Sequence, residues 1–215
     1  MAPDRINLTS LWLALMVVLA AETVAGGIVS LGLLPSMVTL AAVRAVEILL
    51  LVAVAVVLAG GSSAIGLAPE QIVPGIRRGL IWSGGFGLIV LIAAGILALA
   101  GHNPIQMIRV HLPSDPTDRA LYLLTGAVIA PVAEEIFFRG YLYGFFRRWG
   151  VLCALLLSNL AFVLAHGVTG LPLTQMVGGV LFALCYEVEG RLMAPVTVHV
   201  LGNGALFGVG WLNSW

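Results

Sequence analysis

Ionisable and amide side chains interrupt three long apolar stretches of this sequence, where a lipid-spanning helix normally carries only apolar residues. In chain order they are Glu134, Glu135, Arg139, His166, His199 and Asn203. A charged group in hydrocarbon is costly, so residues of this kind generally mark a functional site. Carboxylate, imidazole and amide groups together can supply a general base and hydrogen-bond donors for a transition state. We therefore expect an acid–base site placed inside the membrane.

Helical spacing separates the two adjacent carboxylates. Glu135 and Arg139 are four residues apart, so they share one face of a helix and can form an ion pair. Glu134 points about 100° away around the same helix. We expect Glu134 to remain unpaired and to face a cavity, where it can act as a general base for water. The alternative is a buried ion-pair cluster that only fixes helix packing.

The remaining polar groups also follow helical spacing. Phe162 lies one turn before His166, and His199 lies one turn before Asn203, so each pair shares a helix face. Two polar side chains one turn apart on an apolar helix indicate a lined site. Polar contacts between neighbouring helices are the alternative for both histidines.

Taken together and in this order, the three motifs resemble those of the CAAX protease and bacteriocin-processing family. These Abi-type intramembrane proteases include the type II CAAX prenyl endopeptidases. The resemblance covers residues 121–203 and includes all three motifs. It implies hydrolysis of a peptide bond within a membrane cavity, acting on a membrane-associated peptide or protein.

The resemblance also implies a role for each motif residue. Glu134 and His166 are expected to activate water, while His199 and Asn203 are expected to stabilise the oxyanion. The supporting residues are Glu135, Arg139 and Phe162. A donor aimed at a developing oxyanion is often worth about 3 kcal/mol.

The metal requirement stays open in the sequence. Glu134, His166 and His199 are also a plausible zinc ligand set with an open fourth position. The chain lacks the H-E-x-x-H motif of standard zinc proteases. The family that it resembles has been described both as metalloproteases and as glutamate-type proteases. Because Asn203 is a poor zinc ligand and a good oxyanion donor, we favour the metal-independent form and assign no metal site firmly.

Composition requires a membrane protein to carry this site. The chain is 60% hydrophobic and 9% charged, with a mean hydropathy of +1.09, whereas soluble domains carry about 25% charged residues. The net charge is zero, so no basic face for nucleic acid is expected. Cys153 and Cys185 fit no metal-binding spacing and are expected to be buried small hydrophobic residues.

Apolar runs predict an all-α transmembrane bundle of about seven helices, with the active site in the membrane core. A spanning helix needs about 20 apolar residues. The expected helices cover residues 8–34, 37–58, 80–100, 120–146, 151–166, 173–186 and 195–211. We expect a single integral-membrane domain over residues 1–215, with its motif-bearing core at about 120–210.

The arginines outside the helices predict the orientation. If the N-terminus is cytoplasmic, the cytoplasmic segments hold Arg5, Arg77, Arg78, Arg147, Arg148 and Arg191. The opposite side holds only Arg109 and Arg119. This distribution follows the positive-inside rule. We therefore predict an integral protein of a prokaryotic cytoplasmic membrane, with its N-terminus in the cytoplasm.

The depths of the motif residues along their helices do not match. Glu134 lies about 20 Å from the end of its helix, whereas His199 lies about 6 Å from the start of its own. The site can form if residues 140–148 lie at the membrane interface. The aromatic residues expected in that interface are Tyr141, Tyr143 and Trp149. His166 is then expected to lie too deep.

Three further charges fall in apolar stretches. Arg44 and Glu47 are three residues apart and are expected to pair, and Glu22 is expected to meet Arg44 between helices. We interpret this cluster as structural.

Two non-proteolytic alternatives remain open. One is a membrane immunity or scaffold protein that keeps the fold, and the other is a proton-coupled transporter that uses Glu134 and the histidines as a relay. The chain shows no inverted repeat or paired broken helices of the transporter kind. The sequence leaves open the substrate, its prenylation and the oligomeric state; the bilayer is the one certain partner.

Overall fold

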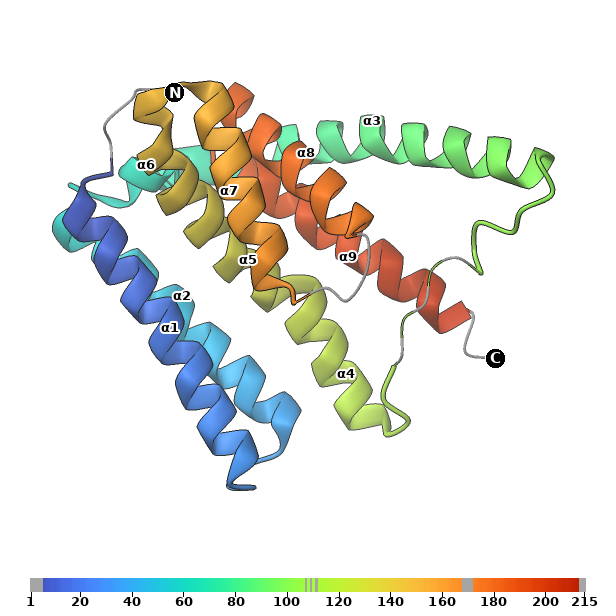
Figure 1. Ribbon diagram of the computed structural model, residues 1–215, viewed down its shortest axis with the longest axis horizontal. Helices are drawn as coiled ribbons and strands as arrows, with labels where there is room; N and C mark the ends of the chain where they lie inside the picture. Colours follow the sequence, from blue (N-terminus) through green and yellow to red (C-terminus); the bar gives the residue numbers. More distant parts are fainter. Residues whose placement is uncertain (1–5, 107, 109, 111, 168–171, 213–215) are drawn as a thin grey trace.

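A computed structural model of the chain describes residues 6–106, 108, 110, 112–167 and 172–212. The structure is 84% helical, and no strand occurs in the residues that it describes. The helices form seven rods (Figure 1). The predicted all-α bundle is therefore confirmed, and it agrees with the requirement that backbone groups in lipid be satisfied within each helix.

The first two helices form an antiparallel hairpin. They are α1, Leu8–Ser30, and α2, Ser36–Leu58. Asn7 caps α1, since its Oδ1 accepts the backbone N–H of Ser10 at 2.7 Å. Its Nδ2 donates to the carbonyl of Leu58 at 3.1 Å. One asparagine therefore joins the start of α1 to the end of α2.

An ion-pair cluster lies partway along this hairpin. Arg44 contacts Glu22 of α1 and Glu47 of α2, the latter at 2.5 Å, which confirms both predicted pairs. The side chain of Glu47 is 2% exposed and that of Glu22 is 55% exposed. Glu47 also lies close enough to Glu134 for their charges to interact. Mutual neutralisation is what makes such charges tolerable within a membrane span.

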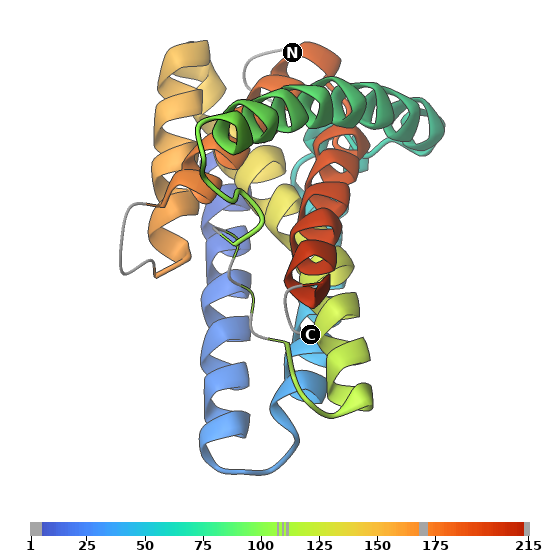
Figure 2. The ribbon, with the colours of Figure 1, turned by 90° about the vertical axis from the view of Figure 1, so that its right-hand side faces the viewer.

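The third helix begins earlier than predicted, and its axis runs in a different direction from those of α1 and α2. Two 3₁₀ turns, η1 (Ser62–Ile65) and η2 (Pro69–Gln71), lead into α3, Ile72–Leu99, which begins well before the predicted position 80. α3 runs crosswise to α1 and α2 in both views (Figure 1, Figure 2). It packs closely on α9 where it crosses it, because a Cβ atom at Gly79 would lie 2.5 Å from Cβ of Thr197.

The fourth rod carries the two adjacent glutamates and changes its helical type several times. Its parts are α4 (Pro116–Leu124), the π-helical η3 (Thr125–Ile129), α5 (Ala130–Glu135), the π-helical η4 (Ile136–Tyr143), α6 (Gly144–Phe146) and the 3₁₀ turn η5 (Arg147–Trp149). Asp115 caps its start by accepting the backbone N–H groups of Thr117 and Asp118. π-helical turns are rare and occur frequently at functional sites. Here one lies on each side of α5.

Three further helices complete the bundle. They are α7 (Val151–Ala165), α8 (Leu173–Glu189) and α9 (Met193–Leu212), each within a few residues of its predicted range. Gly150 and Gly190 have φ angles of 103° and 61° and form the turns before α7 and after α8. Glycine suits both turns because other residues rarely adopt positive φ.

Five helical segments of the described chain are long and apolar enough to cross a membrane, judged by length and composition. They are Leu8–Ser30, Ser36–Leu58, Ser62–Leu99, Pro116–Trp149 and Met193–Leu212. α7 is apolar but shorter. The chain is therefore an integral membrane protein, with seven rods of which five have the length of full spans.

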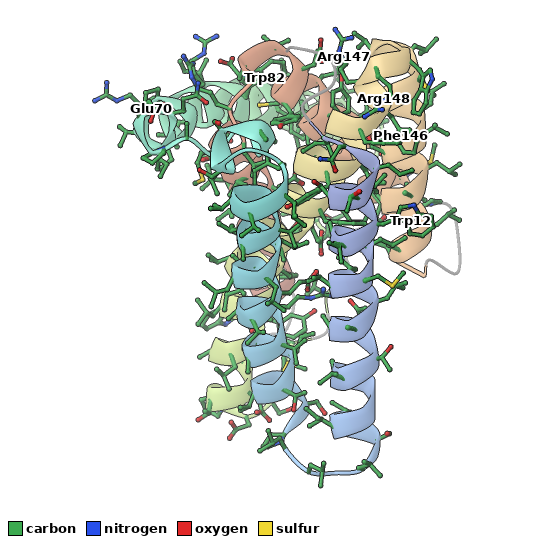
Figure 3. The ribbon with its side chains drawn as sticks, turned by 90° about the vertical axis from the view of Figure 1, so that its left-hand side faces the viewer. Trp12, Glu70, Trp82, Phe146, Arg147 and Arg148 are labelled. Atoms are coloured by element: carbon green, nitrogen blue, oxygen red, sulfur yellow. The ribbon has the colours of Figure 1, made fainter. Side chains whose placement is uncertain are left out.

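Arginines gather at one end of the molecule, where Arg147 and Arg148 lie (Figure 3). Arg147 binds Glu187 of α8 with an Nη2–Oε1 distance of 2.9 Å. Arg78 of α3 binds Glu189 of α8 with an Nε–Oε2 distance of 2.9 Å. We call these two ion pairs the basic-end clamp. They join the last turn of α8 to α3 and to the end of the fourth rod.

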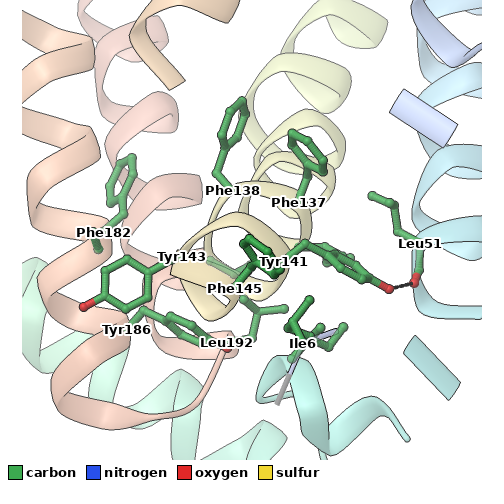
Figure 4. Close-up of a cluster of buried hydrophobic side chains, with 14 of the residues drawn as sticks. Ile6, Leu51, Phe137, Phe138, Tyr141, Tyr143, Phe145, Phe182, Tyr186 and Leu192 are labelled. Atoms are coloured by element: carbon green, nitrogen blue, oxygen red, sulfur yellow. Dashed lines mark hydrogen bonds between the residues drawn. The ribbon is translucent and has the colours of Figure 1, made fainter. Parts of the chain in front are cut away.

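Tyr141 and Tyr143 of the fourth rod are buried within the protein. Tyr141 donates its hydroxyl to the carbonyl of Leu51 at 2.6 Å (Figure 4). Tyr143 donates to Glu187 at 2.9 Å. Both tyrosines are fully buried, whereas Trp149 is 59% exposed. Protein contacts therefore cover Tyr141 and Tyr143, whereas Trp149 lies at the surface, and their placement in the membrane interface stays a prediction.

Candidate functional site

The three motif segments lie on three different helices and meet at one place. Glu134 is on α5, His166 directly follows α7, and His199 is on α9. Oε2 of Glu134 lies 3.8 Å from Nε2 of His166 and 3.8 Å from Nε2 of His199. The Glu134 and His166 side chains are 22% and 28% exposed, while that of His199 is 5% exposed. One carboxylate oxygen thus faces two imidazole nitrogens at a partly open site.

Glu135 is the buried centre of this arrangement. Its Oε1 accepts Nη1–H of Arg139 at 3.0 Å, which confirms the ion pair predicted from their spacing. The same oxygen lies 2.8 Å from Nδ1 of His199. The Glu135 and Arg139 side chains are 0% and 1% exposed. The sequence did not reveal the link from Glu135 to His199, because it joins helices 64 residues apart.

Arg139 is surrounded by aromatic rings as well as by its carboxylate partner. Its guanidinium carbon lies 4.6 Å from the ring centroid of Phe162 and 5.3 Å from that of Phe182. Rings at these distances attract a cation electrostatically. Its Nη2–H donates to the carbonyl of Gly179 at 3.0 Å. A buried arginine needs such partners, since an unpaired buried charge is strongly unfavourable.

The four-residue spacing of Phe162 and His166 has a direct structural reason. α7 ends at Ala165, so the carbonyl of Phe162 is among those left without a helical partner. Nδ1 of His166 lies 2.7 Å from that carbonyl oxygen, and the two rings are 4.5 Å apart. Because a carbonyl oxygen only accepts, Nδ1 carries the proton. In the neutral imidazole, Nε2 then presents its lone pair toward Glu134.

His199 is held by stacking as well as by hydrogen bonding. Its ring lies parallel to that of Phe182, with centroids 4.3 Å apart and an interplanar angle of 20°. Nδ1 faces Glu135, so Nε2 is the nitrogen turned toward Glu134. Phe182 and Gly179 belong to α8, which carries none of the three sequence motifs. Sequence reasoning therefore missed both residues, and the Gly178-Gly179 pair was the only local signal.

Asn203 lies one helical turn beyond His199 and is fixed by the fourth rod. Its Nδ2 donates to the carbonyl of Gly126 at 2.9 Å. Gly126 belongs to the π-helical segment η3. Since an amide nitrogen carries two hydrogens, one N–H of Asn203 remains available as a donor. The structure thus brings Glu134, His166 and His199 together, and it places Asn203 one helical turn further along α9, against η3.

The predicted conflict in depth is absent from the structure. Oε2 of Glu134 lies 3.8 Å from Nε2 of His166 and 3.8 Å from Nε2 of His199. Their depths therefore match, and the expectation that His166 lies too deep is wrong. The π-helical η4 also advances less per residue than an α-helix, which brings Glu134 nearer the basic end than predicted.

The donor spacing does not fit a zinc ion as it stands. Two ligands bound tetrahedrally at the usual zinc distances lie about 3.3 Å apart, whereas Glu134 is 3.8 Å from each histidine nitrogen. Among the described residues, no group of three His, Cys, Asp or Glu side chains has metal-binding geometry. A bridging water fits the same gap with ordinary hydrogen-bond lengths.

The chain is similar to one known protein family and to one bacterial protein. A family model described as type II CAAX prenyl endopeptidase Rce1-like matches residues 116–205, a range that contains every motif residue. A protein of Escherichia coli described as an uncharacterized 24.3 kDa protein is 30% identical over 151 residues. That alignment covers 65% of this chain and 70% of the relative. No solved structure matches the chain.

Proposed function

This chain belongs to the Rce1-like type II CAAX prenyl endopeptidase family, and from that premise we propose that it is an intramembrane endopeptidase. It hydrolyses a peptide bond of a membrane-associated protein or peptide. The family match supports protease activity at family level. The observation that carries the proposal is the position of Glu134 Oε2, 3.8 Å from two imidazole nitrogens whose other ring nitrogens are already engaged.

The proposed reaction starts with a water held between Glu134 and His166. Both facing atoms are acceptors, and a water about 2.8 Å from each fits between them. The water directs one hydrogen to the carboxylate and the other to the imidazole. Its lone pair is then free to attack a carbonyl carbon.

The bond changes follow ordinary peptide hydrolysis. Glu134 removes a proton as the water oxygen bonds to the scissile carbonyl carbon, and the carbonyl oxygen takes the negative charge. When the tetrahedral intermediate collapses, the C–N bond breaks and the leaving nitrogen receives the proton from Glu134. The products are a carboxylic acid and an amine, and transfer of the acid proton to the amine gives the carboxylate and the ammonium group.

Two donors are proposed to stabilise the oxyanion. Asn203 offers the Nδ2–H that the Gly126 carbonyl leaves free. His199 can donate from Nε2 only when both ring nitrogens carry protons, because Nδ1–H already faces Glu135. Its proposed role therefore requires a proton on each ring nitrogen. Glu135 and Arg139 position His199 in this scheme.

We propose that this chemistry needs no metal ion, with zinc held by Glu134, His166 and His199 as the alternative. The 3.8 Å separations support the water-bridged arrangement. Stringent chelation tests the choice. Activity that is lost on chelation and restored by zinc would overturn the metal-independent form.

We propose that the basic end faces the cytoplasm of a prokaryotic cell. Arg77, Arg78, Arg147, Arg148 and Arg191 support this orientation through the positive-inside rule. Two arginines used in the sequence prediction, Arg5 and Arg109, lie outside the described residues.

Cleavage of a library of membrane-anchored peptides in liposomes tests the proposal. The wild-type protein is expected to cleave at least one peptide, and Glu134→Gln is expected to cleave none at a comparable rate. A folded wild type that cleaves nothing would favour a scaffold role. Proton flux through the same liposomes would instead favour a transporter.

A further inference from the structure

Arg139 reaches beyond its glutamate partner to the backbone of α8. Nη1 donates to Glu135, which contacts His199, and Nη2 donates to the carbonyl of Gly179 at 3.0 Å. The guanidinium is 1% exposed, so these contacts fix its position. A backbone carbonyl of α8 therefore helps to hold the carboxylate that orients His199.

The same glycine receives a side chain from α7. A Cβ atom at Gly179 would lie 1.9 Å from Oδ1 of Asn159 and 3.1 Å from Cδ1 of Phe162. Oδ1 thus occupies the place that any other residue's side chain would take. It is buried without a conventional hydrogen-bond partner among the described residues. The Cα–H of Gly179 points at it, a weak contact that recurs where helices pack closely.

Asn159 belongs to the helix face that carries His166. Phe162 lies three residues after Asn159, and His166 lies seven residues after it, so all three share one stripe of α7. Phe162 packs against His166 and lies under the Arg139 guanidinium. A Cβ atom at Gly179 would therefore press on Phe162 directly as well as on Asn159.

We propose that Gly179 is a positioning residue of the active site, acting through Asn159 on α7 and through Arg139 on the Glu135–His199 pair. The proposal rests on the proposed function and adds a residue outside the three motifs. It sets the relative placement of His166 and His199, the two imidazoles that face Glu134. Gly179 itself touches none of the reacting atoms.

The neighbouring glycine provides a matched control. A Cβ atom at Gly178 would meet Phe182 at 3.4 Å, which is ordinary van der Waals contact. Gly178→Ala and Gly179→Ala thus make the same chemical change one residue apart on one helix. Any general cost of replacing glycine in α8 affects both variants.

The kinetic test compares these variants and a suppressor. Gly179→Ala is expected to lower kcat about 100-fold with KM changed less than threefold, since small misplacements of reacting groups have effects of this size. Gly178→Ala is expected to stay within threefold of wild type. Because Asn159→Ala removes the clashing oxygen, the double variant is expected to recover at least tenfold in kcat. Wild-type kcat in Gly179→Ala, or no recovery in the double variant, would overturn the proposal.

Imidazole ¹⁵N NMR in nanodiscs supplies a test that needs no substrate. Gly179→Ala is expected to shift the His199 resonances, Gly178→Ala to leave them in place, and the double variant to restore them. If Gly179→Ala does not fold, Asn159→Leu is measured in its place. It puts a larger side chain against Gly179 from α7 and is expected to shift the His199 resonances. Unchanged His199 resonances in the folded variant would refute the proposal. A wild-type protein that cleaves no peptide refutes the proposed function instead. The NMR result then decides separately whether Gly179 positions His199.

Discussion

Each histidine of the site is held by a partner that determines which of its ring nitrogens faces Glu134. The carbonyl of Phe162 fixes Nδ1 of His166, and Glu135 fixes Nδ1 of His199. Both histidines therefore turn Nε2 toward Glu134. The motif spacing thus has a hydrogen-bonding reason. It places His166 one turn from the Phe162 carbonyl and places His199 beside Glu135 of a neighbouring helix.

The amide of Asn203 provides a test of oxyanion stabilisation. Asn203→Ala is expected to lower kcat about 10²–10³-fold with little change in KM, as for the loss of one oxyanion donor. Gly202→Ala is the control, since a Cβ atom there meets nothing within 4 Å. Steady-state cleavage rates in liposomes measure both. A kcat for Asn203→Ala within threefold of the control argues against the donor role.

Local spacing was sufficient to predict part of this site and insufficient for the rest. The pair of Glu135 and Arg139 followed from a four-residue separation on one helix, and the structure confirms it. The contact between Glu135 and His199 depends on how α5 and α9 pack. No pattern within either helix encodes that packing, so sequence reasoning could not supply it.

At the level of the elements, the crossing of α3 and α9 depends on a missing side chain. A Cβ atom at Gly79 would lie 2.5 Å from Cβ of Thr197 and 2.6 Å from the carbonyl oxygen of Ala194. Because backbone atoms cannot move aside easily, Gly79→Ala is expected to lower the free energy of unfolding by about 1–3 kcal/mol. Thermal unfolding in detergent measures the effect.

Gly84 on the same helix is the matched control for that crossing. A Cβ atom there meets nothing within 4 Å, so Gly84→Ala is expected to leave stability unchanged or to raise it slightly. Equal melting temperatures for the Gly79 and Gly84 variants would show that α3 does not pack on α9 in this way.

The basic-end clamp predicts how stability varies with pH. Burial alone raises the pKa of Glu187, but hydrogen bonds from Arg147 and Tyr143 outweigh it and hold the pKa below its ordinary value. Hydrogen bonds from Arg78 and Trp82 likewise outweigh burial and lower the pKa of Glu189. A lowered carboxyl pKa contributes stability above the unfolded-state value, and this contribution is lost as pH falls through the folded-state value.

The melting temperature should therefore be steady from neutral pH down to about pH 5 and should fall below about pH 4. Glu187→Gln removes one titrating group and is expected to flatten the acid limb. Thermal unfolding in detergent across this range measures both proteins. Identical acid limbs would mean that Glu187 is not held by the clamp.

For the whole molecule, the apolar pattern predicted seven helices, and the structure has seven rods. The direction of α3 was not predictable, because its apolar surface gives no indication of which face packs inward. The change to π-helix in the fourth rod was also missed, since no motif for it was recognised in the sequence. That change accounts for part of the error in predicted depths.

The proposed orientation can be tested with reporter fusions. A fluorescent protein fused after Arg148 is expected to fluoresce, because that end is placed in the cytoplasm. Alkaline phosphatase fused after Ser114 is expected to be active, because that segment is placed on the opposite side. The reverse pattern at both positions would show that the end near Arg148 faces away from the cytoplasm. It would not affect the geometry of the site.

Activation of water by Glu134 without a metal ion is tested by the single-turnover rate of metal-stripped protein on a cleaved membrane peptide. Wild-type protein is expected to keep its rate after chelation, and Glu134→Gln is expected to lower the rate about 10³-fold, as for the loss of a general base. Circular dichroism and melting temperature should match between the two proteins. A Glu134→Gln rate within tenfold of wild type would rule out Glu134 as the general base, and a wild-type rate that disappears on chelation and returns with zinc would rule out the metal-independent mechanism.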